Sequence, residues 1–544
     1  MDQIVPRAQR QTLNSVEEIS QTDCLAALGL GRAFGDPDAD VTRIDTHCSA
    51  VFLVGDRAYK LKRAIKTAYL DYSTLELRHR ACVREVMLNR RTAPALYLGV
   101  APLTLDPQHG LMVEGEGPTV DWLVVMKRFD PALGFDHLAA RGDLTPAMVI
   151  DATDQALALH ATARRMGDGD NHGGGAFGFA ANMFDTIEEL KTAKGCVTIP
   201  QLGRLGVSLS AHMTHYAERL NRRLDEGKVL QGHGDLHLGN IALVDGRPTL
   251  FDCIEFDDRI GAIDQGYDFA FLWMDLDRLG LRDLAWASFH RYLEQTGDYE
   301  IAHLLPLFLS TRALVRAKTG AAAAKLEGEL AAITHERDRA HAYADAAEHY
   351  LDPERPQLIA VGGLSGTGKS TAARAIAPDI GVTPGAVVLR TDCIRKQMFD
   401  TSPDLPLPQS AYTAAVTRKV YERMGLIAEG LLDAGHSVIL DAVFARPAER
   451  NAVEQIAARG GADFSGLWLT APLDVRLERV CGRSGDASDA DASIVREQDL
   501  YRIGALDWTQ IDATGGQCDT ASRMADALAE NGRKRLNAAH AATE

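Results

Sequence analysis

The stretch LIAVGGLSGTGKST, residues 358–371, decides the fold of the C-terminal part of this chain. Its first four residues are apolar and predict a buried strand, and the pattern GxxxxGK(S/T) follows from Gly363 to Ser370. Glycine lets the backbone wrap so that successive N–H groups point at phosphate oxygens, and a helix is expected after the loop. The stretch therefore predicts a strand, a phosphate-binding loop and a helix, in that order.

We expect this loop to hold a nucleotide by its phosphates. Lys369 is expected to reach the outer phosphates, and the hydroxyl of Ser370 is suited to Mg²⁺. A glycine-rich structural turn is the alternative, which the flanking strand and helix disfavour. The predicted nucleotide-binding residues of the loop are Gly363, Ser365, Gly366, Thr367, Gly368, Lys369, Ser370 and Thr371.

Further strand-like runs alternate with helical stretches after the loop, which predicts a parallel sheet wrapped by helices. Two of these runs end near aspartates, Asp392 and Asp441. We expect Asp392 to accept the proton of an attacking hydroxyl, Arg395 to hold an anionic acceptor, and Asp441 to support Mg²⁺ or its waters. A helix N-cap just after a strand is the alternative for each aspartate.

A polar segment, residues 484–490, follows a helical stretch that carries Arg476, Arg479 and Arg483. These arginines are expected to close over the transferring phosphoryl group as part of a lid, with Arg483 in contact with the nucleotide. A solvated helix face followed by a surface loop explains the same pattern nearly as well.

The C-terminal part resembles the small P-loop kinases, including the kinase part of phage polynucleotide kinase and the zeta-toxin type. The resemblance covers roughly residues 357–515 and rests on the loop, the run TDCIRK at 391–396 and the arginine-bearing segment. In that group an aspartate and an arginine after the second strand act as base and acceptor clamp. The resemblance implies these roles for Asp392 and Arg395, and it leaves the acceptor open.

A second motif, QGHGDLHLGNI at residues 231–241, lies in the N-terminal part. Asp235 stands five residues before Asn240, and Asp252 follows a predicted hairpin. This is the spacing of a kinase catalytic loop, in which one carboxylate acts on the hydroxyl while Asn and Asp hold Mg²⁺. A zinc site through His233 and His237 is the alternative, although the interspersed glycines disfavour the helix that it needs.

The run HGDLHLGN resembles the aminoglycoside-phosphotransferase and choline-kinase superfamily. The resemblance implies a small lobe with a lysine for the nucleotide phosphates and a glutamate that pairs with it. Lys60 matches the lysine position, Lys62 faces the same side of a period-two strand and could substitute, and Glu85 is the expected partner. A surface ion pair is the alternative for this glutamate. The chain departs from protein kinases in having no clear glycine-rich loop before Lys60.

The fold expected overall is an N-terminal bilobal, protein-kinase-like fold of the aminoglycoside-phosphotransferase type, joined to a parallel α/β P-loop kinase domain. The predicted domains are a small lobe at 26–128, a helical large lobe at 129–352 and the P-loop domain at 357–544. Two prolines, Pro353 and Pro356, end the preceding helical pattern and set the last boundary.

Composition and net charge narrow the range of partners and cellular locations that we expect. The net charge of −17 makes nucleic acid an unlikely partner, because a phosphate backbone demands a basic surface. No apolar run is long enough to span a bilayer and no secretion signal is evident at the N-terminus, so we expect a cytoplasmic protein. The eight cysteines form no CxxC pair and are expected to be buried, reduced thiols.

The order of features resembles bacterial proteins described as bifunctional aminoglycoside phosphotransferase and ATP-binding proteins, over nearly the full chain. We expect two Mg·ATP-dependent sites that transfer the γ-phosphate to hydroxyl groups of small molecules. Two alternatives stay open: one domain binds ATP to regulate the other, or the C-terminal domain is a polynucleotide 5′-hydroxyl kinase. The acceptors and the oligomeric state are also open.

Overall fold

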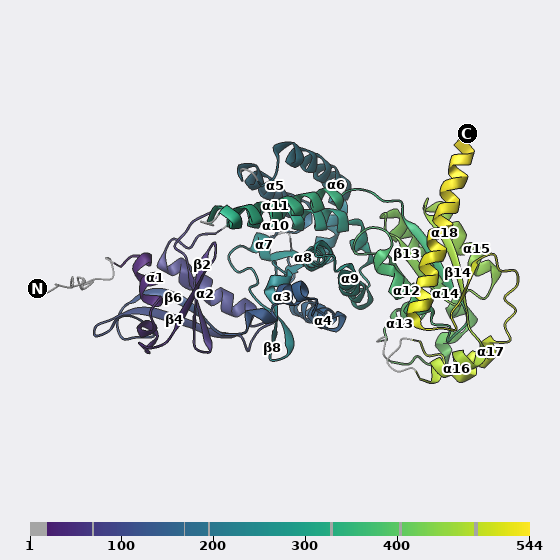
Figure 1. Ribbon diagram of the computed structural model, residues 1–544, viewed down its shortest axis with the longest axis horizontal. Helices are drawn as coiled ribbons and strands as arrows, with labels where there is room; N and C mark the ends of the chain where they lie inside the picture. The colour runs from purple at the N-terminus through teal and green to yellow at the C-terminus, as the bar shows by residue number, and fades with distance from the viewer. Residues whose placement is uncertain are drawn as a thin grey trace, which may run out of the picture. The chain divides into compact units, whose positions relative to one another are not determined.

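The computed structural model describes residues 19–67, 70–167, 169–193, 196–326, 330–401, 405–482 and 488–543 (Figure 1). The chain divides into two compact units. Unit 1 comprises Met1–Gly206, Met213–Phe271 and Val315–Ala342, and unit 2 comprises Val207–His212, Leu272–Leu314 and Tyr343–Glu544. Unit 2 therefore joins an upstream segment, 272–314, to the part that carries the phosphate-binding loop. The three domains drawn from the sequence stay a prediction.

Unit 1 begins with a small lobe built on one antiparallel sheet. Its strand order is β1-β2-β3-β6-β4-β5. The strands are β1 (Val41–Asp45), β2 (Ser49–Val54), β3 (Arg57–Lys62), β4 (Tyr97–Asp106), β5 (Gly110–Val113) and β6 (Thr119–Lys127). Because side chains alternate along a strand, Tyr59 and Leu61 enter a core with Phe52, while Lys60 and Lys62 face the other side.

Helix α2 (Leu75–Asn89) lies on the side of the sheet that the two lysines face. It begins at Thr74, whose hydroxyl accepts a hydrogen bond from the backbone N–H of Leu77. Cys82 and Val86 of the helix pack with Val124 of β6. This packing turns Glu85 of the same helix inward, where it is fully buried. The strand expected to carry Lys60 and Lys62 on one side is confirmed.

The larger lobe of the N-terminal part is helical, as expected. The helices between the small lobe and β11 are α3 (Phe135–Arg141), α4 (Pro146–Thr162), α5 (Gly175–Thr192), α6 (Ile199–Asp225), α7 (Asp258–Gly261), α8 (Gln265–Arg278), α9 (Arg282–Thr296), α10 (Leu305–Leu326) and α11 (Leu330–His349). Of these, α9 belongs wholly to unit 2, and α6, α8, α10 and α11 are divided between the units. Two short antiparallel pairs interrupt them. Strand β7 (Val229–Gln231) pairs with β10 (Ala262–Asp264), and β8 (Ile241–Val244) pairs with β9 (Arg247–Leu250).

Unit 2 contains a five-stranded parallel sheet in the order β12-β13-β11-β14-β15. The strands are β11 (Gln357–Gly362), β12 (Val387–Arg390), β13 (Val438–Asp441), β14 (Asp463–Thr470) and β15 (Thr509–Asp512). The main helices around it are α12 (Lys369–Ile376), α13 (Thr391–Met398), α14 (Ala414–Asp433), α15 (Pro447–Arg459), α16 (Leu473–Cys481), α17 (Ala492–Gln498) and α18 (Gln517–Thr543). The bilobal and parallel α/β fold classes are thus confirmed, while β15 was not foreseen.

Among the described residues, no helix combines the length and the apolarity that a bilayer span requires. The cysteines are free, as expected, but they are not all buried: Cys481 and Cys518 are exposed. Both lie on or beside helices near the surface of unit 2, so the uniform burial expected from composition is wrong.

Candidate functional site

Two lysines of β3 share one carboxylate in the small lobe. The Nζ of Lys60 lies 3.0 Å from Glu85 Oε1, and the Nζ of Lys62 lies 2.6 Å from Glu85 Oε2. Burial alone would raise the pKa of Glu85, but the two ammonium groups outweigh it and lower that pKa to about 2. The pair of Lys60 and Glu85 is therefore an enclosed ion pair, and the surface alternative is wrong.

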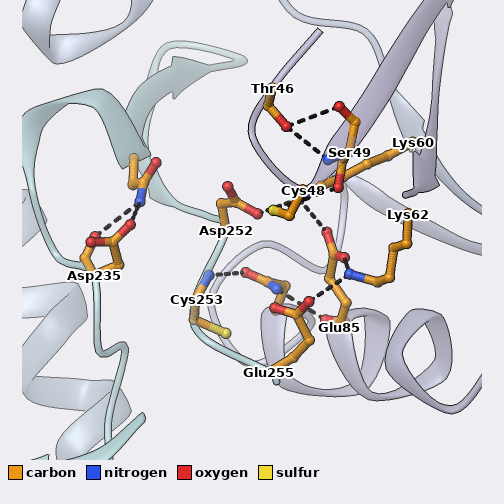
Figure 2. A network of polar contacts seen from close by, with 12 residues as sticks. Thr46, Cys48, Ser49, Lys60, Lys62, Glu85, Asp235, Asp252, Cys253 and Glu255 are labelled. Atoms are coloured by element: carbon orange, nitrogen blue, oxygen red, sulfur yellow. Dashed lines mark hydrogen bonds and ion pairs between the residues drawn. The ribbon is translucent and has the colours of Figure 1, made fainter. Parts of the chain in front are cut away.

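The two lysines differ in what else they contact. Lys62 is 1% exposed and is enclosed by Glu255 Oε1 at 2.5 Å and the hydroxyl of Tyr72 at 3.3 Å. Lys60 is 13% exposed and its Nζ lies 2.6 Å from Asp252 Oδ1. Figure 2 shows Asp252 in the gap between Asp235 and the lysines of β3. Lys60 is thus the lysine that faces the candidate site, while Lys62 ties β3 to the segment after Asp252.

Asp252 follows the β8–β9 hairpin with φ of +60°, a left-handed conformation that aspartate tolerates better than most residues. The turn is held on both sides. The backbone N–H of Asp252 donates to the hydroxyl of Tyr97 at 3.2 Å, and that of Cys253 donates to Asn89 Oδ1 at 2.9 Å. The carboxylate is 43% exposed, so it remains open to a metal ion while it pairs with Lys60.

The motif around Asp235 forms a compact loop. Asn240 Nδ2 donates to Asp235 Oδ2 at 2.9 Å and to its backbone oxygen at 3.0 Å. His237 Nε2 lies 3.4 Å from the same carboxylate. Burial would raise the pKa of Asp235, but the contact with His237 and the charge of Arg316 lower it, which keeps the carboxylate ionised. The structure therefore brings Asp235 and Asn240 together as the spacing predicts.

One buried carboxylate behind this loop was missed in the sequence. Asp268, on α8, accepts hydrogen bonds from the backbone N–H groups of His233 at 2.7 Å and Gly234 at 2.9 Å. His160 Nε2 lies 2.9 Å from Asp268 Oδ2. A Cβ on Gly232 would lie 2.3 Å from the same oxygen, so glycine is needed there for close approach. No local spacing links Asp268 to the motif, and only the tertiary fold reveals it.

The zinc alternative finds no support in the geometry. His233 is fully buried, and burial lowers the pKa of its imidazole. The residues from 231 to 240 form a strand end, a loop and a single turn of 3-10 helix at Leu238–Asn240, so His233 and His237 do not share a helical face. Within the described ranges, no three His, Cys, Asp or Glu side chains are grouped as a metal site would require.

In unit 2 the phosphate-binding loop has the expected strand before it and helix after it. Gly363, Gly366 and Gly368 adopt positive φ angles of +142°, +85° and +87°. A Cβ on Gly366 would lie 2.5 Å from the backbone oxygen of Arg476, so the loop passes too close to α16 for a side chain. The wrapped backbone predicted from the motif is confirmed.

Ser370 and the end of β13 meet beside this loop. Ser370 Oγ donates to Asp441 Oδ2 at 2.5 Å, and Arg390 Nε lies 3.4 Å from the same oxygen. Asp392 lies in the first turn of α13, whose N-cap is Arg390, so the capping alternative for Asp392 is wrong. Burial and the charge of Asp441 raise the pKa of Asp392, against the opposing effect of Arg390. Arg390 was missed, although it immediately precedes the quoted run 391–396.

A cavity of about 1840 Å³ connects these groups. A drug-sized ligand site is usually about 300–1,000 Å³, so this cavity is larger than one such ligand requires. From the predicted set, the cavity is lined by Ser365, Gly366, Thr367, Gly368, Lys369, Ser370, Thr371, Asp392, Arg395 and Asp441. Arg395 donates to the backbone oxygen of Ala411 at 2.8 Å and its guanidinium stacks over Tyr412 at 4.9 Å.

The arginines expected in a lid behave differently from one another. Arg476 is 2% exposed, donates to the backbone oxygen of Ala471 and pairs with Asp499, so it is fixed within the fold. Arg479 lines the cavity and donates to the backbone oxygen of Ala513 at 2.8 Å. Arg483 lies outside the described residues. The expectation of a closing lid is therefore wrong for Arg476, which is already fixed.

Known proteins were compared with the chain. A family model described as an AAA domain matches residues 358–502, the segment that carries the phosphate-binding loop. The chain is 33% identical over 499 residues to an uncharacterized protein of Mycobacterium tuberculosis, Rv2004c, and the match covers 89% of this chain and 93% of the relative. The chain belongs to the family of this mycobacterial protein. A relative from Mycobacterium bovis, Mb2027c, matches with the same figures.

Three solved structures each match a part of the chain at lower identity. An ethanolamine kinase of Plasmodium vivax is 11% identical, with 60% of this chain and 89% of that chain covered and a TM-score of 0.38. The Mycobacterium tuberculosis APS kinase is 23% identical, with 32% and 99% covered and a TM-score of 0.25. A gluconokinase from Sinorhizobium meliloti is 20% identical, with 34% and 98% covered and a TM-score of 0.24.

Proposed function

We propose that the chain is an ATP-dependent kinase with two phosphoryl-transfer sites, one in each unit, that act on hydroxyl groups of small molecules in the cytoplasm. One observation carries the proposal. The phosphate-binding loop, the Ser370–Asp441 pair and Asp392 line one cavity with room for both a nucleotide and an acceptor. A loop that only bound ATP would need neither the extra cavity volume nor the carboxylate of Asp392 in the cavity wall.

In the P-loop site, Lys369 and the backbone of residues 363–368 bind the phosphates. Ser370 and Asp441 offer oxygen ligands at hydrogen-bond distance from one another, and such ligands suit Mg²⁺, which when bound neutralises phosphate charge. Asp392 takes the proton of the acceptor hydroxyl. Arg395, held by Ala411 and Tyr412, contributes fixed positive charge to the acceptor side of the cavity.

In the kinase-like site of unit 1, Lys60 binds nucleotide phosphates and Glu85 holds the lysine in place. Asn240 and Asp252 present oxygens that suit Mg²⁺, and Asp235 orients or deprotonates the acceptor hydroxyl. The low pKa of Asp235 keeps it ionised at neutral pH, so it can accept a hydrogen bond from a hydroxyl throughout the physiological range.

The experiment that tests this proposal follows labelled γ-phosphate from ATP into a panel of sugars, amino alcohols, aminoglycosides and nucleotides. Wild type is compared with Asp235→Asn and Lys369→Ala, each of which disables one site. We expect a product that disappears in one variant alone, which assigns its acceptor to that site. ATP binding without any labelled product would contradict the proposal and favour a regulatory role.

The polynucleotide alternative is tested separately. If this alternative were correct, a 5′-hydroxyl oligonucleotide in the same panel would be labelled by wild type and not by Lys369→Ala. Its binding would also weaken steeply with salt concentration, because lysines and arginines would hold its phosphate backbone. The net charge of −17 leads us to expect neither result.

A further inference from the structure

Helix α9 presents three polar side chains, four residues apart, toward the P-loop sheet within unit 2. Trp286 Nε1 donates to the backbone oxygen of Ala386 at 2.8 Å. His290 Nε2 lies 3.1 Å from the backbone oxygen of Val388, and because a carbonyl only accepts, this nitrogen carries the proton. Glu294 Oε1 lies 3.1 Å from Arg374 Nη2. A spacing of four places all three on one face of the helix.

These contacts complete the edge of the sheet. Strand β12 is the outermost strand, and its inner side pairs with β13. The carbonyls of Ala386 and Val388, two residues apart, point to the outer side, where an edge strand otherwise has no partners. Trp286 also enters the core of the sheet with Val388 and Ile439. Helix α9 therefore provides partners for two carbonyls of this edge, while the backbone N–H of Ala386 donates to Ala377.

The anchored strand leads directly to the catalytic groups proposed for this site. Arg390 is two residues beyond the anchored carbonyl of Val388 and lies 3.4 Å from Asp441. Asp392 follows in the first turn of α13. Any shift of β12 along or away from the sheet therefore moves Arg390 and Asp392 relative to the phosphate-binding loop.

The same helix also contacts the nucleotide side of the site. Arg374 belongs to α12, the helix that begins at Lys369, and its partner Glu294 lies 3.4 Å from His290 Nδ1 as well. Glu294 and Arg291 line the cavity together with the phosphate-binding loop. One turn of α9 thus touches both the strand that carries the proposed base and the helix that holds the phosphates.

We propose that α9 is a positioning element of the P-loop site, in which His290 and Trp286 fix the strand that carries Arg390 and Asp392, and Glu294 fixes α12 through Arg374. This inference rests on the phosphoryl-transfer function proposed for that site. It also means that the site is incomplete without residues 282–296, which the sequence assigns to the helical lobe.

The test uses the full chain and three variants of α9. His290→Ala removes the anchor of Val388, and His290→Gln retains an N–H donor near the position of Nε2. Ser288→Ala is the matched control, because Ser288 Oγ accepts a buried hydrogen bond from Trp273 Nε1 at 3.0 Å and neither residue contacts β12 through that bond. Each variant is measured for Lys369-dependent ATP turnover, for KM of ATP and for Tm.

We expect His290→Ala to lower kcat by about tenfold or more, since small displacements of reacting groups cost up to about a hundredfold, with KM for ATP little changed. His290→Gln should recover part of kcat. Ser288→Ala should lower Tm without lowering kcat. Equal kcat in His290→Ala and Ser288→Ala at similar Tm would overturn the inference. If Lys369→Ala turned over ATP as fast as wild type, the function proposed for the site would instead be refuted.

Hydrogen exchange provides a readout that does not depend on turnover. In His290→Ala, the amides of residues 389–394 should lose protection selectively. If His290→Ala folds poorly, Trp286→Phe is measured in its place. The Phe variant keeps an aromatic ring in the core, and it removes the N–H donor to Ala386 together with part of the indole's volume. Protection that falls equally in Ser288→Ala would contradict a positioning role for this face of α9.

Discussion

Lys60 and Lys62 hold the carboxylate of Glu85 from its two ends, one ammonium group on each oxygen. The arrangement distinguishes the lysine that faces the open site from the lysine that is enclosed in the fold, which the sequence alone could not do. Lys62 is enclosed with Glu255 and Tyr72, whereas Lys60 continues to Asp252 at the open side of the lobe. The lysine proposed to bind nucleotide and the lysine that is enclosed within the fold therefore lie two positions apart on one strand.

This division predicts opposite effects of two similar substitutions. Lys60→Met should abolish nucleotide binding in unit 1 with a modest loss of stability. Lys62→Met leaves Glu85 and Glu255 buried without their shared partner, and removing one member of a buried ion pair costs about 3–5 kcal/mol. Titration with a fluorescent ATP analogue and urea unfolding measure the two effects. Equal stability of the two variants would contradict the division.

The small lobe should lose stability in acid. The folded-state pKa of Glu85 is lowered to about 2 from an ordinary value of 4.5, so its contribution is present above about pH 4.5 and is lost as the pH falls toward 2. Near-UV circular dichroism of the unfolding transition between pH 3 and pH 7 measures this. Glu85→Gln should flatten the dependence, while Glu76→Gln, which removes an exposed pair on the same helix, should leave it unchanged.

Asp268 should matter to the rate of the unit 1 site without touching a substrate. Asp268→Asn weakens the bonds from the backbone N–H groups of His233 and Gly234, because a charged acceptor holds them about twice as strongly as a neutral one. We expect kcat to fall by about tenfold with little change in nucleotide affinity. Asp275→Asn is the control on the same helix, since its buried carboxylate accepts from Tyr343 instead. A change in affinity alone would argue against this role.

The P-loop site should show an acidic limb in its pH profile, along which activity rises with pH. The pKa of Asp392 is raised, so the ionised form that accepts a proton appears at higher pH than for an ordinary aspartate, and activity should rise with pH through that pKa. The same shift means that ionisation of Asp392 costs folding stability above its pKa. Asp392→Asn should therefore remove transfer, yet raise Tm at neutral pH. A lower Tm would show that the charge stabilises the fold.

How much of the molecule could be predicted depends on the range of the contacts involved. The phosphate-binding loop and the pair Asp235 and Asn240 were predictable because backbone geometry fixes them within a few residues. The strands and helices around them follow from local periodicity. Glu85 was found because a known motif asks for a partner of Lys60.

The residues that were missed act over long separations. Asp268 holds a loop 35 positions away, and Glu255 pairs with Lys62 across a separation of 193 positions. Such pairings arise from packing, which one sequence does not encode as a pattern. The prediction that Arg476 belongs to a lid was wrong because Arg476 pairs with Asp499. The sequence of a helix packed in this way does not differ from that of a helix exposed to solvent.

The place of α9 in unit 2 has a consequence for how such a chain can evolve. A recombination event at Pro353–Pro356 would separate the two predicted domains at their boundary in the sequence. The downstream part would then lack Trp286 and His290, which contact its sheet. Its edge strand would then be bare, and bare edges pair with other chains and aggregate. Inheritance of the two parts as a single gene is therefore expected, with recombination at that seam selected against.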